Sequence, residues 1–176
     1  MAIKYAILGI LSARPQTGYD LKKAFAGSAV LHWSGNNNQI YTTLSDLLKA
    51  GLVTKEVQPQ EKHPAKSVYT ITDQGLAALK EWALSRPDPP EYRSDFWIRL
   101  MAVGQLTGAE FTQLLDQYEQ EVHAQLLMQQ ELARRGHAIA TKSPREERLQ
   151  DLIMDGIAGF YQRELEWIGK LRKELR

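Results

Sequence analysis

The chain has 176 residues, of which 43% are apolar and 24% are charged, and this composition supports a packed core and excludes a wholly disordered protein. It contains no cysteine, which excludes disulfides, thiolate metal sites and cysteine catalysis and fits a reducing cytoplasm. Because no segment is long and apolar enough to span a bilayer, we expect a cytoplasmic protein without a membrane partner.

The net charge of +1 is distributed unevenly along the chain. Residues 1–66 hold eight Lys and Arg against four Asp and Glu, whereas residues 107–176 hold ten against twelve. A basic N-terminal part on a weakly acidic remainder is the asymmetry expected when only one end of a protein meets phosphates.

Two short helices are predicted at the N-terminus. Apolar residues recur at helical spacing over residues 3–13, and Pro15 ends this first helix. Thr17 and Asp20 then form the pattern of a capping box, in which each side chain satisfies a backbone N–H of the other residue. The box predicts the start of a second helix that runs to about Phe25.

A third helix is predicted after a loop rich in Gly, Ser and Asn over residues 26–38. Asn36 or Asn37 is placed to cap this helix, which runs to Ala50, and Gly51 occupies the position of a left-handed C-terminal cap. Its expected buried stripe consists of Ile40, Leu44, Leu47 and Leu48.

A β-hairpin and a fourth helix complete the N-terminal part. Residues 52–57 and 67–71 have strand character, and the polar segment 58–66 between them, with two prolines, predicts the hairpin tip. Thr72 caps the following helix, which runs to about Leu84.

Three prolines within residues 87–90 forbid a continuous helix and mark the clearest boundary in the chain. We therefore divide the chain into a first domain (1–84), a Pro-rich linker (85–93) and a helical domain (94–176). Apolar stripes in this last domain predict helices over about 94–103, 108–135 and 145–175. A second copy of the chain would cover the stripes that one thin helical layer leaves open, so we expect a homodimer through these helices.

The predicted fold is mainly α with a small β-hairpin: an N-terminal winged helix-turn-helix and a C-terminal α-helical dimerisation domain. The third helix would be the recognition helix, because its second stripe carries donors, acceptors and one cation of a size that enters a major groove. A solvated helix face shows the same pattern. The stripe consists of Asn38, Tyr41, Thr42, Ser45 and Lys49, and the hairpin tip adds Lys62, His63 and Lys66, which a wing would lay along the DNA backbone.

Five short segments, in this order, resemble the successive signatures of PadR-type repressors. They are Gly18-Tyr19-Asp20-Leu21, residues 38–44 (Asn-Gln-Ile-Tyr-Thr-Thr-Leu), Ala50-Gly51-Leu52-Val53, His63-Pro64-Ala65-Lys66 and residues 69–75 (Tyr-Thr-Ile-Thr-Asp-Gln-Gly). The layout of residues 94–175 is similar to the dimerisation domain of the family's larger subgroup, which includes phenolic-acid-responsive and virulence-activator-like members.

The resemblance implies a winged-helix dimer that represses transcription until an effector weakens DNA binding. Two recognition helices in a homodimer would require a pseudo-palindromic operator in double-stranded DNA. Tyr19 and Tyr41 match tyrosines that approach the DNA backbone in the family, and arginine is common at the position of His63. Asn37-Asn38 replaces the family's frequent Pro-Gly pair. The predicted DNA-binding residues are Tyr19, Lys22, Asn38, Gln39, Tyr41, Thr42, Ser45, Lys49, Lys62, His63 and Lys66.

Aromatic residues of the helical domain offer a candidate pocket for a small aromatic or hydrophobic effector. They are Phe96, Trp97, Tyr118, Phe160 and Tyr161, and Trp167 belongs to the same stripe. Aromatic residues at helical spacing also form cores and dimer interfaces.

The sequence shows no catalytic, metal or cofactor motif. The four histidines have no paired ligand spacing, and the chain has neither a phosphate loop nor a nucleophile elbow. We therefore expect no enzymatic activity, no metal and no cofactor. The alternatives to a DNA-binding regulator are a winged helix used for protein–protein contact and a small-molecule sensor without a DNA role.

Overall fold

The computed structural model describes residues 2–28, 38–59, 65–89, 94–136 and 139–175. The chain forms two compact units, of which the first comprises residues 1–86 and 136–150 and the second comprises residues 87–135 and 151–176. The chain first leaves the first unit and enters the second between residues 86 and 87, which lie in the Pro-rich segment. The domain limits drawn at residues 84 and 94 stay a prediction.

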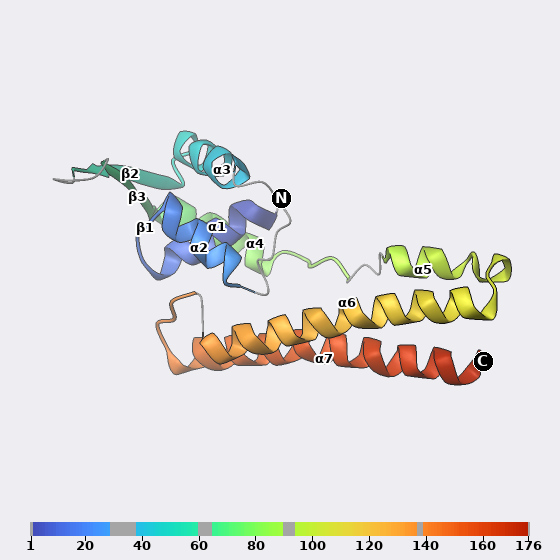
Figure 1. Ribbon diagram of the computed structural model, residues 1–176. Coiled ribbons are helices and arrows are strands. Elements are labelled where there is room, and N and C mark those ends of the chain that lie inside the picture. Colours follow the sequence, from blue (N-terminus) through green and yellow to red (C-terminus); the bar gives the residue numbers. More distant parts are fainter. Residues whose placement is uncertain (1, 29–37, 60–64, 90–93, 137–138, 176) are drawn as a thin grey trace. The chain divides into compact units, whose positions relative to one another are not determined.

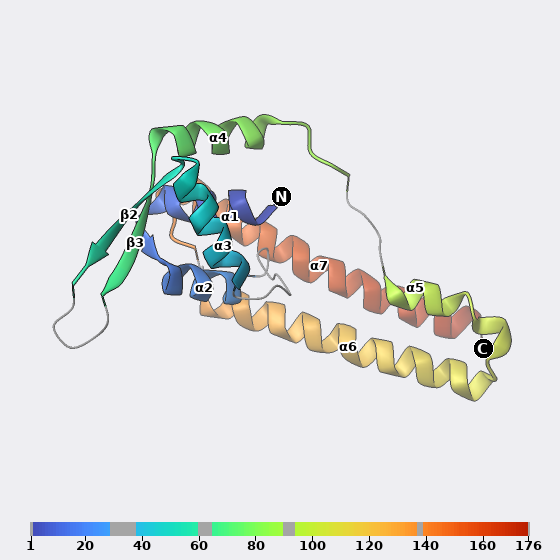
Figure 2. The same cartoon turned by 90° about the horizontal axis from the view of Figure 1, so that it is seen from above.

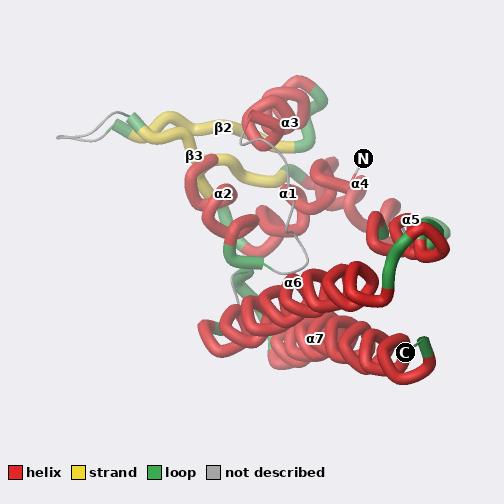
Figure 3. The backbone as a smooth tube through the Cα atoms, turned by 45° about the vertical axis from the view of Figure 1, so that its right-hand side comes forward, coloured by secondary structure: helices red, strands yellow, loops and turns green. Residues whose placement is uncertain are grey.

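The first unit is a winged helix. Its elements are α1 (Ala2–Ala13), β1 (Gln16–Thr17), α2 (Gly18–Ala26), α3 (Asn38–Lys49), β2 (Val53–Gln58), β3 (Lys66–Ile71) and α4 (Asp73–Leu84) (Figure 1). The three strands form an antiparallel sheet in the order β1-β3-β2, shown in yellow in Figure 3. The predicted hairpin is present. β1 adds a third strand, which was not predicted because two residues are too few to show an alternating pattern.

The core of the first unit lies among helices α1–α3 and the sheet. Its buried residues are Ile7, Leu8, Ile10, Leu11, Leu21, Ala24, Phe25, Ile40, Leu44, Leu47, Leu52, Val53 and Tyr69. The segment from residue 136 to 150 also belongs here, because Ile139 packs against this core and the Lys142 ammonium donates to the Ser12 carbonyl oxygen.

Two helix starts confirm the predicted caps. The Asp20 N–H donates to Thr17 Oγ1 and the Thr17 N–H donates to Asp20 Oδ2, each over 3.1 Å, so the capping box of α2 is complete. At α4, Thr72 Oγ1 accepts from the Gly75 N–H (3.0 Å) and donates to the Gly51 carbonyl oxygen (2.8 Å). The cap proposed for α3 at Asn36 or Asn37 lies outside the described residues.

The end of α3 confirms one prediction and corrects another. Gly51 has a φ of 69°, and the Leu52 N–H donates to the Leu47 carbonyl oxygen over 3.0 Å, as in a Schellman motif. Leu48, however, was expected in the buried stripe and is 39% exposed. At 3.6 residues per turn, Leu48 lies about 80° around the helix from Ile40, at the edge of the stripe.

The second unit is helical, as predicted. It contains α5 (Asp95–Leu100), a 3-10 turn η1 (Val103–Gln105), α6 (Gly108–Arg135) and most of α7 (Pro144–Glu174), and its core gathers around Phe96, Phe111 and Leu115. The first helix is shorter than expected, since it stops at Leu100. Among the described residues, no helix combines the length and apolarity that crossing a membrane requires.

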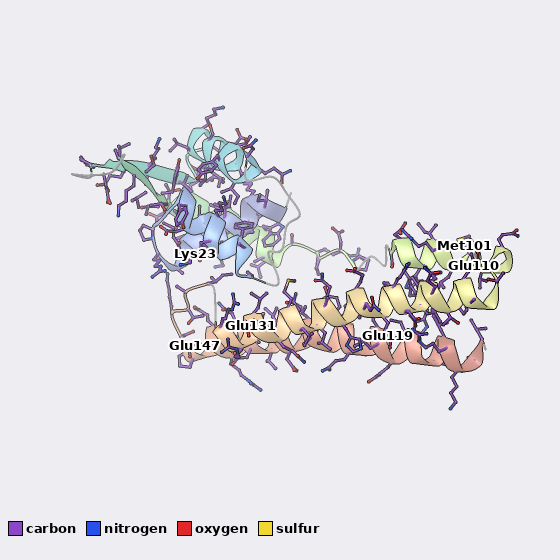
Figure 4. The ribbon with its side chains drawn as sticks, in the orientation of Figure 1. Lys23, Met101, Glu110, Glu119, Glu131 and Glu147 are labelled. Carbon is purple, nitrogen blue, oxygen red and sulfur yellow. The ribbon has the colours of Figure 1, made fainter. Side chains whose placement is uncertain are left out.

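A charge cluster joins the two long helices of the second unit. Arg172 of α7 donates from Nη2 to Asp116 Oδ1 (2.5 Å) and to Glu119 Oε2 (2.7 Å) on α6; Glu119 is labelled in Figure 4. Although the partial burial of Arg172 works in the opposite direction, these hydrogen bonds raise the pKa of its guanidinium. Arg172 is 21% exposed, so the cluster is partly shielded from solvent.

Candidate nucleic-acid interface

Helix α3 presents a continuous polar face to solvent. Its buried side is formed by Ile40, Leu44 and Leu47. All the predicted recognition residues of α3 are exposed, namely Asn38, Gln39, Tyr41, Thr42, Ser45 and Lys49. The hydroxyl of Thr42 donates to the Asn38 carbonyl oxygen (2.9 Å), and its two lone pairs stay available as acceptors.

A groove next to this face brings together residues from α2, α3 and β3. It has a volume of about 600 Å³ and is lined by residues 17–20, Tyr41, Lys66, Ser67 and Tyr69. Three predicted DNA-binding residues, Tyr19, Tyr41 and Lys66, therefore meet in one place. Tyr19 is 70% exposed and Tyr41 is 51% exposed, so both rings are accessible to a ligand.

The absence of a side chain at Gly18 permits the position of the Tyr41 ring. A Cβ at Gly18 would lie 2.6 Å from Tyr41 Cε1, closer than real Cβ contacts come. The Tyr41 ring of α3 thus rests on the first turn of α2, and this contact explains why residue 18 is a glycine.

The acid in the groove is held in its charged form. The hydrogen bond from the Thr17 hydroxyl to Asp20 (2.7 Å) is the main cause that lowers the pKa of the Asp20 carboxyl, and the positive charge of Lys66 adds to it. Because its lone pairs serve the α2 cap, Asp20 has a structural role although it lies at the surface.

The predicted DNA-binding residues outside α3 belong to α2 and to the β2–β3 hairpin. Lys22 is exposed on α2 and does not line the groove. Lys66 begins β3 opposite Gln58, where the β2–β3 hairpin projects beyond α2 and α3 (Figure 2). Lys62 and His63 lie outside the described residues.

Sequence reasoning missed Ser67 and Tyr69 in this groove. Both lie in β3, where their alternation with Val68 and Thr70 shows that they share one face of the sheet. Tyr69 is buried, as an apolar-facing residue of an ordinary strand would be. Only the approach of α2 and α3 reveals that this face opens into the groove.

Four aromatic residues form a cluster in the second unit. Phe96 stacks on Tyr118 with ring centroids 3.6 Å apart, and Trp167 contacts both Phe96 (6.1 Å) and Trp97 (5.3 Å). A groove of about 520 Å³ beside this cluster is lined by Phe96 and Tyr118 together with polar residues of α5 and α6.

The other two candidate effector residues form a separate pair. Phe160 and Tyr161 meet edge to face with ring centroids 5.4 Å apart, and Phe160 is 44% exposed.

Burial and the charge of Glu164 raise the pKa of Tyr118, and Tyr161 adds to the effect. The Tyr118 hydroxyl donates to Glu164 Oε2 over 3.1 Å.

Comparison with known proteins identifies both parts of the chain. Residues 7–81 match the family described as "Transcriptional regulator PadR-like family", and residues 92–176 match "Virulence activator alpha C-term". The Negative transcriptional regulator PadR of Bacillus subtilis is 30% identical over 125 residues, which cover 70% of this chain and 69% of that protein. The chain belongs to the PadR-like family of transcriptional regulators. The predicted resemblance is confirmed, as is the prediction that the chain is not an enzyme.

Solved structures are similar to this PadR-like regulator over nearly its whole length. The crystal structure of Bacillus subtilis PadR in complex with operator DNA has a TM-score of 0.83 and 25% identity, covering 97% of each chain. The Vibrio cholerae virulence activator AphA has a TM-score of 0.74 and 28% identity, covering 98% of this chain and 97% of AphA. These similarities confirm the predicted winged-helix and helical fold.

Proposed function

We propose that this PadR-like regulator binds double-stranded operator DNA, with α3 in the major groove and the β2–β3 hairpin along the sugar-phosphate backbone. The observation that carries the proposal is the continuity of the exposed face of α3 with the groove that holds Tyr19, Tyr41 and Lys66. Support comes from Bacillus subtilis PadR, which was solved with operator DNA.

Within this proposal the exposed residues have two roles. Side chains on α3 that carry amides and hydroxyls read base edges, and these are Asn38, Gln39, Thr42 and Ser45. Tyrosines and lysines contact phosphates and fix the register of the protein, and these are Tyr19, Lys22, Tyr41, Lys49 and Lys66, joined by Lys62 and His63 of the hairpin tip.

The regulator acts as a homodimer that represses transcription. Apolar side chains on α6 and α7 are exposed in the single chain, including Leu127 (64%), Leu152 (52%) and Phe160 (44%), and a second copy would cover them. Two recognition helices then meet two half-sites of a pseudo-palindromic operator. The negative regulation named for Bacillus subtilis PadR favours repression over activation.

A small aromatic or hydrophobic effector controls the DNA complex in this proposal. The groove beside Phe96 and Tyr118 combines stacked rings with polar groups that can orient a ligand. A crystal structure of Bacillus subtilis PadR in complex with p-coumaric acid has a TM-score of 0.76 and 25% identity to this chain. Hydroxycinnamic acids are therefore the first compounds to test.

The decisive experiment measures binding to a duplex from the gene's own upstream region at several salt concentrations. We expect tight binding that weakens steeply with salt, and much weaker binding to a random duplex of equal length. Replacing Lys62 and Lys66 by Gln should flatten the salt slope by about two units, one for each lost phosphate contact.

The controls separate this function from its alternatives. Lys80→Gln removes a charge from the exposed side of α4 and should leave the slope unchanged. A chain that binds both duplexes equally weakly, with no dependence on salt, would instead be a protein–protein module or a sensor without a DNA role.

A further inference from the structure

The hydroxyl of Tyr69 has no hydrogen-bond partner among the described residues of the winged helix. Tyr69 lies in the middle strand, opposite Gln16 of β1 and Lys55 of β2, and only 9% of its surface is exposed. Within the described part of the chain, its hydroxyl makes no hydrogen bond. Because the hydroxyl of a largely buried tyrosine usually bonds to another group of the protein, we asked what else the Tyr69 hydroxyl can reach.

The Tyr69 hydroxyl can be reached from the groove. Among the described residues, Gln129 Oε1 is the only side-chain polar atom that is fully enclosed and unpartnered, so Tyr69 Oη must retain some contact with solvent. Tyr69 lines the groove together with Tyr41 and Ser67. The three hydroxyl-bearing side chains therefore border the same open space.

Net charge does not explain what this groove would bind. Its charged lining residues are Lys66 and Asp20, whose charges cancel, and the Asp20 carboxylate already accepts from the N–H and the hydroxyl of Thr17. A ligand would gain mainly from neutral donors, namely the hydroxyls on β3 and α3. The start of α2 borders the groove and adds the positive end of a helix dipole, which favours an anion.

We propose that Tyr69 donates a hydrogen bond to a backbone phosphate of bound DNA and is a contact residue of the interface. The proposal rests on the function proposed above. A phosphodiester fits better than a free anion, because the groove is open and continues into the exposed rings of Tyr19 and Tyr41, which a duplex would cover and a free anion would not.

The variant Tyr69→Phe tests this contact because it removes one oxygen and keeps the buried ring. In the free protein the described residues offer the lost hydroxyl no partner other than solvent, so we expect a nearly unchanged melting temperature. DNA binding should weaken about tenfold on both the upstream duplex and the random duplex, since a phosphate contact carries no sequence information. The salt slope should not change, because the variant loses no charge.

Two comparisons make the result specific. Tyr5→Phe is the matched control, because Tyr5 stacks on Trp82 in the same unit (4.6 Å between centroids) and does not line the groove; its affinity should equal that of the wild type. Duplexes with one methylphosphonate linkage should locate the contact, since at one linkage the neutral group should weaken the wild type and leave Tyr69→Phe unaffected.

The proposal fails if Tyr69→Phe binds both duplexes within twofold of the wild type, or if no methylphosphonate position shows this coupling. It also fails if the variant melts several degrees lower and loses affinity only in proportion, which would show a structural role. If Tyr69→Phe alters stabilisation by inorganic phosphate but not DNA binding, the groove is a free-anion site and the DNA contact is wrong. A wild-type chain that binds neither duplex would refute the proposed function itself.

Discussion

Gly18 at the start of α2 lies against the ring of Tyr41 on α3, so that an added Cβ would come within 2.6 Å of Tyr41 Cε1. The Tyr41 ring is half exposed and is free to swing outward, so a methyl group at Gly18 would displace it from the groove rather than disturb the core. The glycine therefore positions a tyrosine of the proposed interface without touching DNA itself.

For Gly18→Ala we expect several-fold weaker operator binding with a nearly unchanged melting temperature. Gly18 has no positive φ, so alanine fits its backbone and its better helix propensity offsets the displaced contact. Binding titrations and thermal melts measure the two effects. Gly9→Ala is the control: nothing lies within 4 Å of its added Cβ, so it should stabilise α1 by about 0.5–1 kcal/mol and leave DNA binding alone.

The two faces of α3 should respond differently to truncation. Leu44 is fully buried, so Leu44→Ala should lower the free energy of unfolding by about 2–5 kcal/mol. Leu48 is 39% exposed, so Leu48→Ala should lower the free energy of unfolding by less than about 1 kcal/mol. Tyr41→Ala should instead weaken operator binding in a chain that stays folded. If Tyr41→Ala melts the protein and leaves the affinity per folded molecule unchanged, the assignment of the faces is wrong.

Local signals in the sequence were enough to predict much of this fold. The caps at Thr17, Thr72 and Gly51 depend on residues within a few positions of each helix end, so their patterns are readable without a structure. Leu48 shows the limit of periodicity, because a residue at the edge of a stripe is buried only if a neighbouring element covers it.

The remaining features depend on contacts between distant segments. β1 pairs with β3 across about fifty residues of sequence, and Ile139 reaches the first core from beyond α6. Tyr69 has the pattern of a core strand residue, and only the packing of α2 and α3 around β3 creates the groove that its hydroxyl borders. The spacing of apolar and polar residues within one segment does not indicate which distant segments will contact it.

Gly75 should be the glycine of the first unit that tolerates alanine least. A Cβ there would lie 2.2 Å from the Leu52 carbonyl oxygen and 2.8 Å from Ile71 Cγ1, and the backbone atom cannot move aside cheaply. We expect Gly75→Ala to lower the free energy of unfolding by about 1–3 kcal/mol or more, as overpacking does. Denaturant titration of this variant beside Gly9→Ala gives the comparison, and equal stability of the two would contradict the predicted clash.

The capping box of α2 should make stability depend on acidic pH. Hydrogen bonds from Thr17 lower the pKa of Asp20 below its usual 3.8 in the folded chain. Its contribution is therefore fully present above the pKa of the unfolded chain and is lost as the pH falls through the lower folded value. Asp20→Asn should reduce the loss of melting temperature between neutral pH and about pH 3. Thr17→Val, which removes the hydroxyl that binds Asp20, should reduce it in the same way, and an unchanged profile in both variants would contradict this role.

The last prediction concerns assembly through α7. Three large apolar side chains of α7 remain exposed in the single chain, namely Leu152 (52%), Ile153 (37%) and Phe160 (44%). Covering them would add stability, because burial of apolar surface is the main favourable contribution to folding and association. A two-fold partner would cover them and would hold two recognition helices about one DNA turn, or 34 Å, apart. Leu152→Glu places a charge in this face, so we expect the full-length variant to sediment as a monomer at micromolar concentration.

The same variant should lose most of its operator affinity while it keeps its random-duplex affinity, because each winged helix stays folded and only the paired reading is lost. Gln162→Glu adds the same charge at an exposed position of α7 that lies about 180° around the helix from Ile153 and about 160° from Phe160, and this variant should remain dimeric with normal operator binding. A monomeric wild type, or a dimeric Leu152→Glu with full operator affinity, would show that α7 does not join the two copies, and the spacing of the recognition helices would then need another source.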